Sequence, residues 1–232
     1  MVEPLLKGVA KFQRGYFRRN RERYAQLAKE GQNPGTLFIT CADSRILPDQ
    51  LTGADPGELF VLRNVGNMVP PPDPELADPG VGSAIEYAVS VLNVDQIIVC
   101  GHSHCGACAA LYSGADGDDL PLTRKWLEQG SRVKDIILEK AGSSAETVDE
   151  LFKSGHRCQE VLRATEKAMV VQHLQNLLRY PVVDKHVEAG RLLIHGWYYA
   201  IESGEIEYYD PERLAFVPLS GAEATAARQQ AD

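Results

Sequence analysis

Short runs of branched apolar residues, each followed at once by polar residues, recur along this chain. Runs of this length and composition are typical of parallel strands that are buried on both faces of a sheet. They predict four such strands, at Thr36–Thr40, Leu59–Arg63, Gln96–Gly101 and Leu192–His195. A hairpin is predicted beyond the last of them, with strands at Tyr198–Glu202 and Glu205–Tyr209 joined by a turn at Ser203-Gly204.

Segments with apolar residues at helical spacing lie between the predicted strands. The strongest covers residues 158–178, and others cover 5–28, 106–112 and, less regularly, 131–153. We expect Ser83 to cap a further helix, and Thr123 to cap one that contains Trp126 and Leu127. Pro181 should end the helix at 158–178. Five prolines between residues 69 and 80 favour a loop there.

This alternation of strands and helices predicts an α/β fold: a central, mostly parallel sheet of about four strands with an antiparallel edge strand, flanked by helices. An N-terminal helical arm is expected at about residues 1–30, within a single domain of residues 1–220. The tail at 221–232 is rich in Ala and Gln and is expected to be flexible. The arm is basic in an acidic chain, which fits either a solvated helix face or packing on a second subunit.

Composition narrows the class of protein. The chain has 232 residues, a formal net charge of -8, and 44% hydrophobic and 24% charged residues. This is the balance of a globular protein, and the negative charge argues against nucleic-acid binding. No apolar run approaches the roughly 18 residues of a membrane span, and Met1–Pro4 lacks the apolar core of a signal peptide. Five cysteines, an odd and clustered set, indicate free thiols, so we expect a cytoplasmic protein.

Candidate chemistry lies where two of the predicted strands end. Cys41-Ala42-Asp43-Ser44-Arg45 follows one strand, and His102-Ser103-His104-Cys105-Gly106 follows another. Ligands of open α/β sheets gather at the carboxyl ends of the strands, so Cys41, His102 and Cys105 should meet in one crevice. Two thiolates and an imidazole suit zinc, and three ligands leave a fourth position for water, as in catalytic sites. The alternative is that all three are ordinary buried residues.

Asp43 and Arg45 are two residues apart, which places both side chains on one face of an extended segment. We therefore expect them to form an ion pair. Beside a zinc ion, Arg45 would keep Asp43 ionised and oriented, so that Asp43 could accept the proton of a zinc-bound hydroxide. A plain surface ion pair is the alternative.

The two motifs, about sixty residues apart, resemble those of the β-class carbonic anhydrases, in particular the plant-type and cyanobacterial-like subgroup. Three flanking segments are also similar to that family, namely Gly57–Asn67, Ser83–Val89 and His195–Tyr199. The resemblance runs from about residue 5 to about residue 210. It implies reversible hydration of carbon dioxide to bicarbonate and a proton, with one zinc ion per chain on Cys41, His102 and Cys105.

The resemblance implies further roles. Asp43 would become a fourth zinc ligand, and block the site, when its pair with Arg45 breaks. The chain would form a homodimer or a higher even oligomer, in which the arm packs on a neighbouring subunit and pocket aromatics cross the interface. Packaging in a carbon-fixing microcompartment is left open. The residues implied to contact substrate are Gln32, Phe60, Val65, Gly66 and Tyr87.

Two positions depart from the resembled family. Phe38 stands where a bacterial subgroup with an allosteric bicarbonate site has tryptophan, which argues against regulation of this chain by bicarbonate. Ala168-Met169 replaces an expected asparagine, which concerns local packing rather than chemistry.

Several alternatives stay open. Cys108 completes a C-x-x-C with Cys105 and could close a structural zinc site in a protein that is not an enzyme. The same C-x-x-C could serve redox chemistry, although no thioredoxin-like context surrounds it. Hydrolases of carbonyl sulfide or carbon disulfide share the fold and the zinc motif, although the residues implied to contact substrate favour the anhydrase. His104, between the ligands, could relay protons or be a bystander.

Overall fold

The computed structural model describes residues 2–113, 119–142 and 156–219. The tail expected at 221–232 and most of the second half of the helix expected at 131–153 lie outside these residues. No helix in the described part of the chain is long and apolar enough to cross a membrane.

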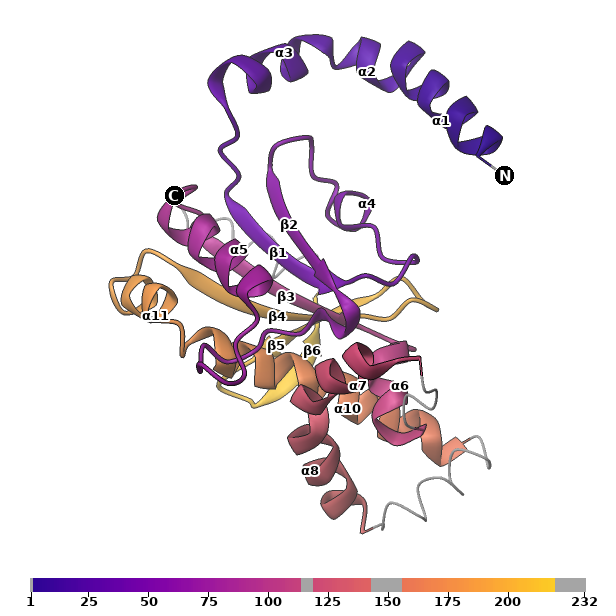
Figure 1. The fold of residues 1–232 in the computed structure, drawn as a ribbon, viewed down its shortest axis with the longest axis vertical. Helices are drawn as coiled ribbons and strands as arrows, with labels where there is room; N and C mark the ends of the chain where they lie inside the picture. The colour runs from indigo at the N-terminus through magenta and orange to yellow at the C-terminus, as the bar shows by residue number, and fades with distance from the viewer. Residues whose placement is uncertain (1, 114–118, 143–155, 220–232) are drawn as a thin grey trace.

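The described residues form one six-stranded sheet in the order β2-β1-β3-β4-β5-β6 (Figure 1). Four neighbouring strands are parallel: β2 (Leu59–Asn64), β1 (Thr36–Cys41), β3 (Gln96–His102) and β4 (Leu193–Tyr199). The antiparallel strands β5 (Ile206–Asp210) and β6 (Ala215–Pro218) complete one edge. The prediction of a mostly parallel sheet with an antiparallel edge is confirmed.

The edge differs from the predicted hairpin in two ways. Tyr198 and Tyr199 continue β4, so the turn spans residues 200–205, where the Ala200 amide donates to the Glu205 carbonyl at 2.9 Å. The strand expected at Tyr198–Glu202 is therefore wrong. The second difference is the additional strand β6. The sequence did not predict this strand because it has only four residues, two of them exposed.

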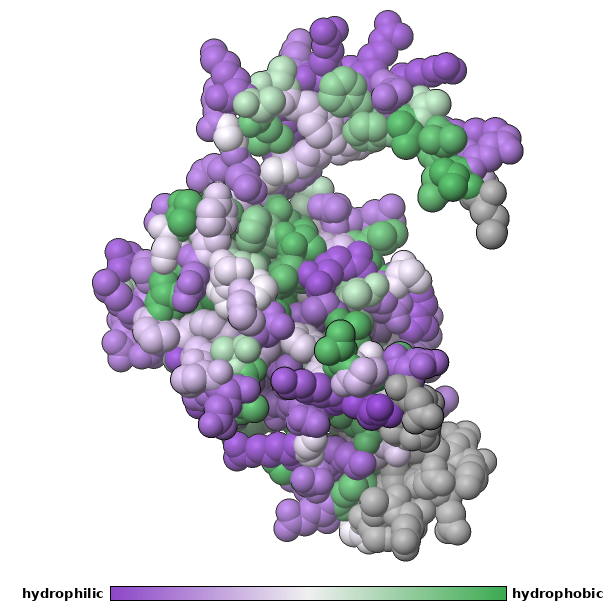
Figure 2. Space-filling view, in the orientation of Figure 1, coloured by the Kyte–Doolittle hydropathy of each residue, from purple (hydrophilic) through white to green (hydrophobic). Residues whose placement is uncertain are grey.

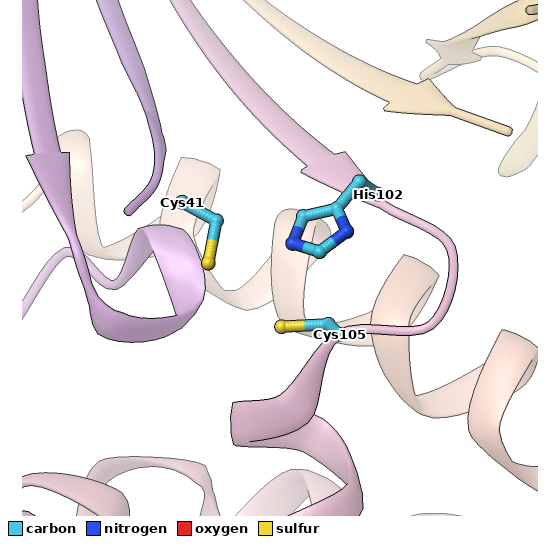
Figure 3. A group of neighbouring side chains, drawn as sticks. All are labelled: Cys41, His102 and Cys105. Carbon is cyan, nitrogen blue, oxygen red and sulfur yellow. The ribbon is translucent and has the colours of Figure 1, made fainter. Parts of the chain in front are cut away.

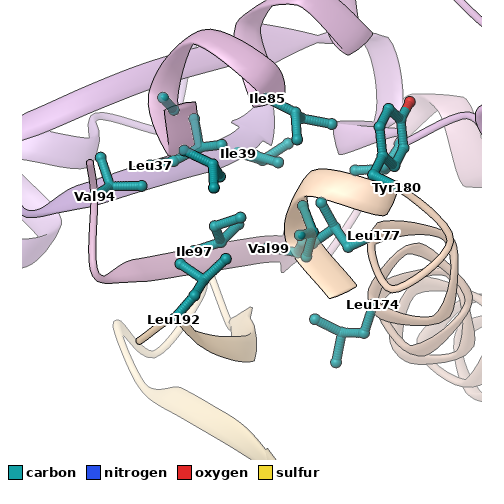
Figure 4. Close-up of a cluster of buried hydrophobic side chains, with 14 of the residues drawn as sticks. Leu37, Ile39, Ile85, Val94, Ile97, Val99, Leu174, Leu177, Tyr180 and Leu192 are labelled. Atoms are coloured by element: carbon teal, nitrogen blue, oxygen red, sulfur yellow. The ribbon is translucent and has the colours of Figure 1, made fainter. Parts of the chain in front are cut away.

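The central strands β1 and β3 are buried, whereas β2 has no buried residue and β4 has two, and helices cover one face of the sheet (Figure 4). The covering helices are α5 (Pro79–Ser90), α10 (His156–Leu177) and α11 (Pro181–Glu188). Fully buried side chains such as Leu37, Ile97 and Leu177 fill the space between the layers. Each such leucine or isoleucine contributes about 1.5–3 kcal/mol of burial free energy. This core fixes β1 and β3 side by side, so their carboxyl ends lie together.

The helix boundaries correct three predictions. The N-cap of α5 is Asp78, whose Oδ1 accepts the Val81 amide at 2.8 Å, and not Ser83. Thr123 lies inside α7 (Pro121–Leu127), which begins after Leu120. Pro181 begins α11, while α10 already ends at Leu177. At each of these starts a proline takes the first helical turn, where its missing amide costs no hydrogen bond.

The remaining elements of the described residues are four short ones and the helix α8, which packs against α10. They are α4 (Pro48–Thr52), the 3-10 turn η1 (Val65–Asn67), α6 (Gly106–Ser113), the 3-10 turn η2 (Glu128–Gly130) and α8 (Ser131–Ala141).

The N-terminal arm consists of three helices rather than the one predicted at 5–28. They are α1 (Glu3–Arg14), α2 (Tyr16–Arg19) and α3 (Arg21–Glu30). The first break is at Gly15, and the second is at Asn20, whose side-chain amide donates to the Tyr16 carbonyl at 2.9 Å.

None of the residues of these three helices is buried. Figure 1 shows the arm extending away from the sheet, and Figure 2 shows apolar side chains gathered on one side of α1. Leu5, Val9 and Phe12 are among the exposed apolar residues there. The arm therefore has an apolar surface that its own chain leaves uncovered.

Candidate metal centre

Cys41, His102 and Cys105 meet at the carboxyl edge of the sheet (Figure 3). Cys41 is the last residue of β1, His102 is the last residue of β3, and Cys105 directly precedes α6. Their potential ligand atoms all lie within 4.8 Å of one another, and the three residues are 6%, 1% and 2% exposed. Figure 3 shows both sulfur atoms and the ring directed into the same space. The structure thus brings the three predicted ligands together.

The hydrogen bonding of His102 leaves one of its ring nitrogens available to a metal ion. Its Nδ1 lies 2.8 Å from the Ser103 carbonyl, so this nitrogen carries the proton and donates it. Its Nε2 then keeps a free lone pair, and this atom is buried without a hydrogen-bond partner. Buried polar atoms are almost always paired, and metal-ligating histidines typically donate their other nitrogen to a carbonyl. The donor set therefore fits zinc.

The metal-free thiols hold their protons strongly. The contact with Cys105, followed by burial, raises the pKa of Cys41 to about 12. The contact with Cys108, together with burial, raises the pKa of Cys105 to about 12. For His102, burial lowers the pKa, but contacts with Cys41 and the Ser103 carbonyl outweigh burial and raise it. A cation must displace these protons, so its affinity for the site falls as the pH falls.

Gly66 in the turn η1 contacts the first ligand directly. Its amide donates to Cys41 Sγ at 3.3 Å. Its φ is 80°, and a Cβ at this position would lie 2.9 Å from the Cβ of Ala107, so only glycine fits. The neighbouring Val65 carbonyl accepts the Trp126 indole at 2.7 Å, which holds the turn in place. Of the predicted Val65-Gly66 pair, Gly66 therefore lies beside Cys41, and Val65 is the neighbour that contacts Trp126.

Asp43 and Arg45 form a two-pronged ion pair next to Cys41. Arg45 Nε donates to Asp43 Oδ1 at 2.9 Å, and Arg45 Nη2 donates to Asp43 Oδ2 at 2.7 Å. The hydrogen bonds from Arg45 hold the pKa of the Asp43 carboxyl well below its usual range, so Asp43 is ionised at neutral pH. Arg45 Nη2 also donates to the His104 carbonyl at 3.0 Å. The pair is thereby tied to the loop between His102 and Cys105.

Arg63 fixes the backbone on which this pair stands. Its Nε donates to the Cys41 carbonyl at 3.0 Å, and its Nη2 donates to the Asp43 carbonyl at 2.7 Å. Arg63 was not expected to take part in the site, because an arginine at the end of a strand has no distinguishing signal in the sequence.

Gln32, Phe60 and Tyr87 do not lie at the metal centre of their own chain. Phe60 pairs with Leu37, while the ligand Cys41 pairs with Asn64 four positions further along β2. At about 3.3 Å per residue this is a separation of ~13 Å. Gln32 precedes β1 at the opposite end from Cys41, and the Tyr87 ring lies 6.0 Å from that of Phe60. Within one chain, these three side chains are therefore remote from the metal centre.

Cys108 and His104 both lie close to the three candidate ligands in sequence, and each contacts a neighbouring side chain. Cys108 is buried beside Cys105, but among the described residues the group able to hold a metal contains only the three predicted ligands. This arrangement does not favour the closed, four-ligand site. His104 Nε2 lies 3.1 Å from Arg163 Nη2, so this ring is held by a neighbour.

Comparisons with known proteins agree on one family. A family model described as carbonic anhydrase matches residues 36–206. A carbonic anhydrase from Synechococcus elongatus is 37% identical over 88% of this chain and 70% of its own length. The solved structure of the β-carbonic anhydrase CcaA superposes with a TM-score of 0.82 at 36% identity, covering 93% of this chain and 98% of that one. A tetrameric β-carbonic anhydrase from Sordaria macrospora matches with a TM-score of 0.73 at 28% identity, over 89% and 95% of the two chains.

Proposed function

The chain belongs to the β-carbonic anhydrases, and from this premise we propose that the centre at Cys41, His102 and Cys105 holds one zinc ion per chain and hydrates carbon dioxide reversibly. The observation that carries the proposal is the buried, unpaired Nε2 of His102 facing two cysteine sulfurs at the carboxyl ends of β1 and β3. Three protein ligands leave a coordination position open for the reaction.

The protein's own groups would hold the zinc ion and orient the water that attacks carbon dioxide. A bound zinc ion supplies a Lewis acid that lowers the pKa of a coordinated water to near 7. Asp43, ionised and held at both oxygens by Arg45, would accept a hydrogen bond from the water that attacks carbon dioxide and would orient that water. With a metal ion bound, the Gly66 amide would offset part of the negative charge of the Cys41 thiolate. Release of Asp43 from Arg45 would let the carboxylate compete for zinc.

The function is tested by initial rates with two substrates. Zinc-loaded protein should hydrate carbon dioxide in stopped-flow assays with a higher kcat/KM than it shows for carbonyl sulfide, and each tenfold between the two corresponds to about 1.4 kcal/mol of the activation barrier. The metal-free protein is the control for both substrates. A higher kcat/KM for carbonyl sulfide would replace this proposal with that of a hydrolase on the same fold.

The site is completed, we propose, by a second copy of the chain. Gln32, Phe60 and Tyr87 lie at the far end of the sheet from their own metal centre, so their proposed role toward substrate requires a partner subunit. The uncovered apolar surface of α1 supplies a contact for that partner. The relative from Sordaria macrospora is described as tetrameric, which is consistent with a dimer as the smallest unit.

Polar substitutions on the apolar surface of α1 should dissociate the assembly. We expect replacement of Leu5, Val9 and Phe12 by serine to produce monomers in sedimentation velocity and to lower kcat/KM by at least about tenfold, because the substitutions remove the apolar side chains that would be buried against the partner. The matched control replaces Lys7 and Lys11, in the same helix, by glutamine and should sediment like the wild type. A wild-type monomer with full activity would contradict the proposal.

We propose a cytoplasmic location because the described cysteines are free thiols. Cys41, Cys100, Cys105 and Cys108 are all free in the described part of the chain. Free thiols that bind metal persist in a reducing compartment.

A further inference from the structure

The three residues between His102 and α6 form a loop that sets the distance between two metal ligands. Figure 3 shows the chain leaving β3 at His102 and turning back to place Cys105 opposite the ring. His104, in the middle of this loop, has a φ of 57°, in the left-handed region that side-chain-bearing residues rarely adopt. A loop in this conformation persists only when surrounding groups hold it.

Each residue of the loop is held by a different group. Ser103 Oγ donates to Glu202 Oε2 at 2.6 Å and accepts the Ile201 amide at 2.8 Å. The Cys105 amide donates to Glu166 Oε1 at 3.0 Å.

His104 completes the set. Its Nε2 lies 3.1 Å from Arg163 Nη2, and because a guanidinium can only donate, this ring nitrogen accepts. Its carbonyl, on the other side of the loop, accepts from Arg45 at 3.0 Å.

These contacts converge on one guanidinium group. Arg163 Nη1 donates to Glu166 Oε2 at 3.2 Å and to the Tyr198 hydroxyl at 3.0 Å, while its Nη2 forms an ion pair with Glu202. The Glu166 side chain is only 1% exposed, and its carboxylate is held by Arg163 and by the Tyr198 hydroxyl, which donates to it at 2.7 Å. Arg163 thus reaches His104 directly, Ser103 through Glu202 and Cys105 through Glu166.

We propose that Arg163 is the positioning residue for the metal-ligand loop Ser103–Cys105. It touches neither the metal ligands nor the reacting atoms, and it acts by fixing the loop through two carboxylates and the His104 ring. Because the His104 carbonyl also accepts from Arg45, displacement of the loop would change the support of the Asp43–Arg45 pair. The inference rests on the proposed zinc site and adds the residues that hold the site in shape.

The test compares Arg163→Gln and Arg163→Lys with a matched arginine elsewhere. Arg179→Gln is the control, because Arg179 also pairs with a carboxylate, that of Asp73 at 2.8 Å, but has no contact with the loop in the described residues. The main readout is the rate at which zinc passes from each folded protein to an excess of a metallochromic chelator. The second is the visible spectrum of the cobalt-substituted proteins, which reports ligand geometry. The third is the separate measurement of kcat and KM.

Arg163→Gln should release zinc about 10- to 100-fold faster than the wild type, the size of effect typical of groups that orient metal ligands. Its cobalt spectrum should change, and kcat should fall more than KM rises. The values for Arg163→Lys should lie between those of Arg163→Gln and the wild type, because the single ammonium of lysine replaces only part of the hydrogen bonding of the planar guanidinium. Arg179→Gln should stay within about twofold of the wild type in every readout, as expected for an exposed ion pair.

Zinc release and a cobalt spectrum at wild-type values in Arg163→Gln would overturn the inference. If that variant does not fold, the test is Glu202→Ala, because Glu202 is half-exposed and its loss removes the contacts with Ser103, His104 and Arg163, while Arg163 keeps its contacts with Glu166 and Tyr198. Zinc release at the wild-type rate in Glu202→Ala would then overturn the inference. Zinc release needs no turnover, so a wild-type protein that binds zinc without hydrating carbon dioxide would contradict only the proposed function.

Discussion

Cys105→Ala should lose zinc and should lower carbon dioxide hydration by more than about a hundredfold. Losing an outer group that orients a ligand already costs about 10- to 100-fold in metal affinity or activity, and losing a ligand itself costs more. The vacancy cannot be filled from nearby without a rearrangement, since the described group of potential ligands contains only Cys41, His102 and Cys105. The measurement is zinc content per chain by elemental analysis, together with stopped-flow rates.

Cys108→Ala is the matched control for this variant. Cys108 is buried to a similar extent and lies one helical turn further along, so the substitution removes an equal volume from the same region. It should retain one zinc ion per chain and most of the activity. Full zinc content in Cys105→Ala, or loss of zinc from Cys108→Ala, would show that the ligand set is assigned wrongly.

Arg45→Ala and Asp43→Asn should each keep zinc and lose about 10²- to 10⁴-fold in kcat, the range expected when a positioned proton acceptor is removed. Arg45→Lys should recover only part of the loss, because lysine lacks the planar fork that holds both carboxylate oxygens. Arg45 holds the pKa of Asp43 far below neutrality, so Asp43 stays ionised from pH 6.5 to 9. Activity of the wild type should therefore rise with pH through about pH 7 to 8, where a coordinated water loses its proton.

An exposed ion pair elsewhere in the chain controls for the loss of charge. Arg179 donates to both oxygens of Asp73 at 2.8 Å, and substitution of either residue should leave hydration rates within about twofold. Zinc should be quantified in every variant across the pH range. If Arg45→Ala and Asp43→Asn run at wild-type rates with full zinc, the Asp43–Arg45 pair is only a salt bridge.

The features that the sequence predicted well depend on local patterns. Each parallel strand corresponds to a short run of branched apolar residues, and two of these strands end at Cys41 and His102. Because both strands are parallel, both ligands lie at the same edge of the sheet. The ion pair of Asp43 and Arg45 follows from a spacing of two in an extended segment. Both predictions use interactions between residues close in sequence or on adjacent strands.

The features that the sequence did not predict depend on distant partners. Arg163 and Glu166 lie on α10 among other polar residues, and their spacing does not distinguish them from solvent-exposed positions. Their roles are visible only in the folded protein, where β4 and the metal-ligand loop pack against that helix. Pro181 was expected to end a helix and instead begins one, because proline fits both roles and only the tertiary structure selects between them. Gly15 interrupts the arm although the apolar spacing continues across it.

The chain order of the groups around the loop has a consequence for biosynthesis. Glu166 follows Cys105 by 61 residues, and Glu202 follows Ser103 by 99. All three metal ligands therefore leave the ribosome well before the side chains that hold their loop. At the usual ~5–20 residues per second, the delay between Ser103 and Glu202 lasts on the order of 5 to 20 s. During that interval the nascent protein already carries Cys41, His102 and Cys105, while the loop Ser103–Cys105 lacks the side chains that hold it, so the loop can be fixed only after Glu202 has been synthesised.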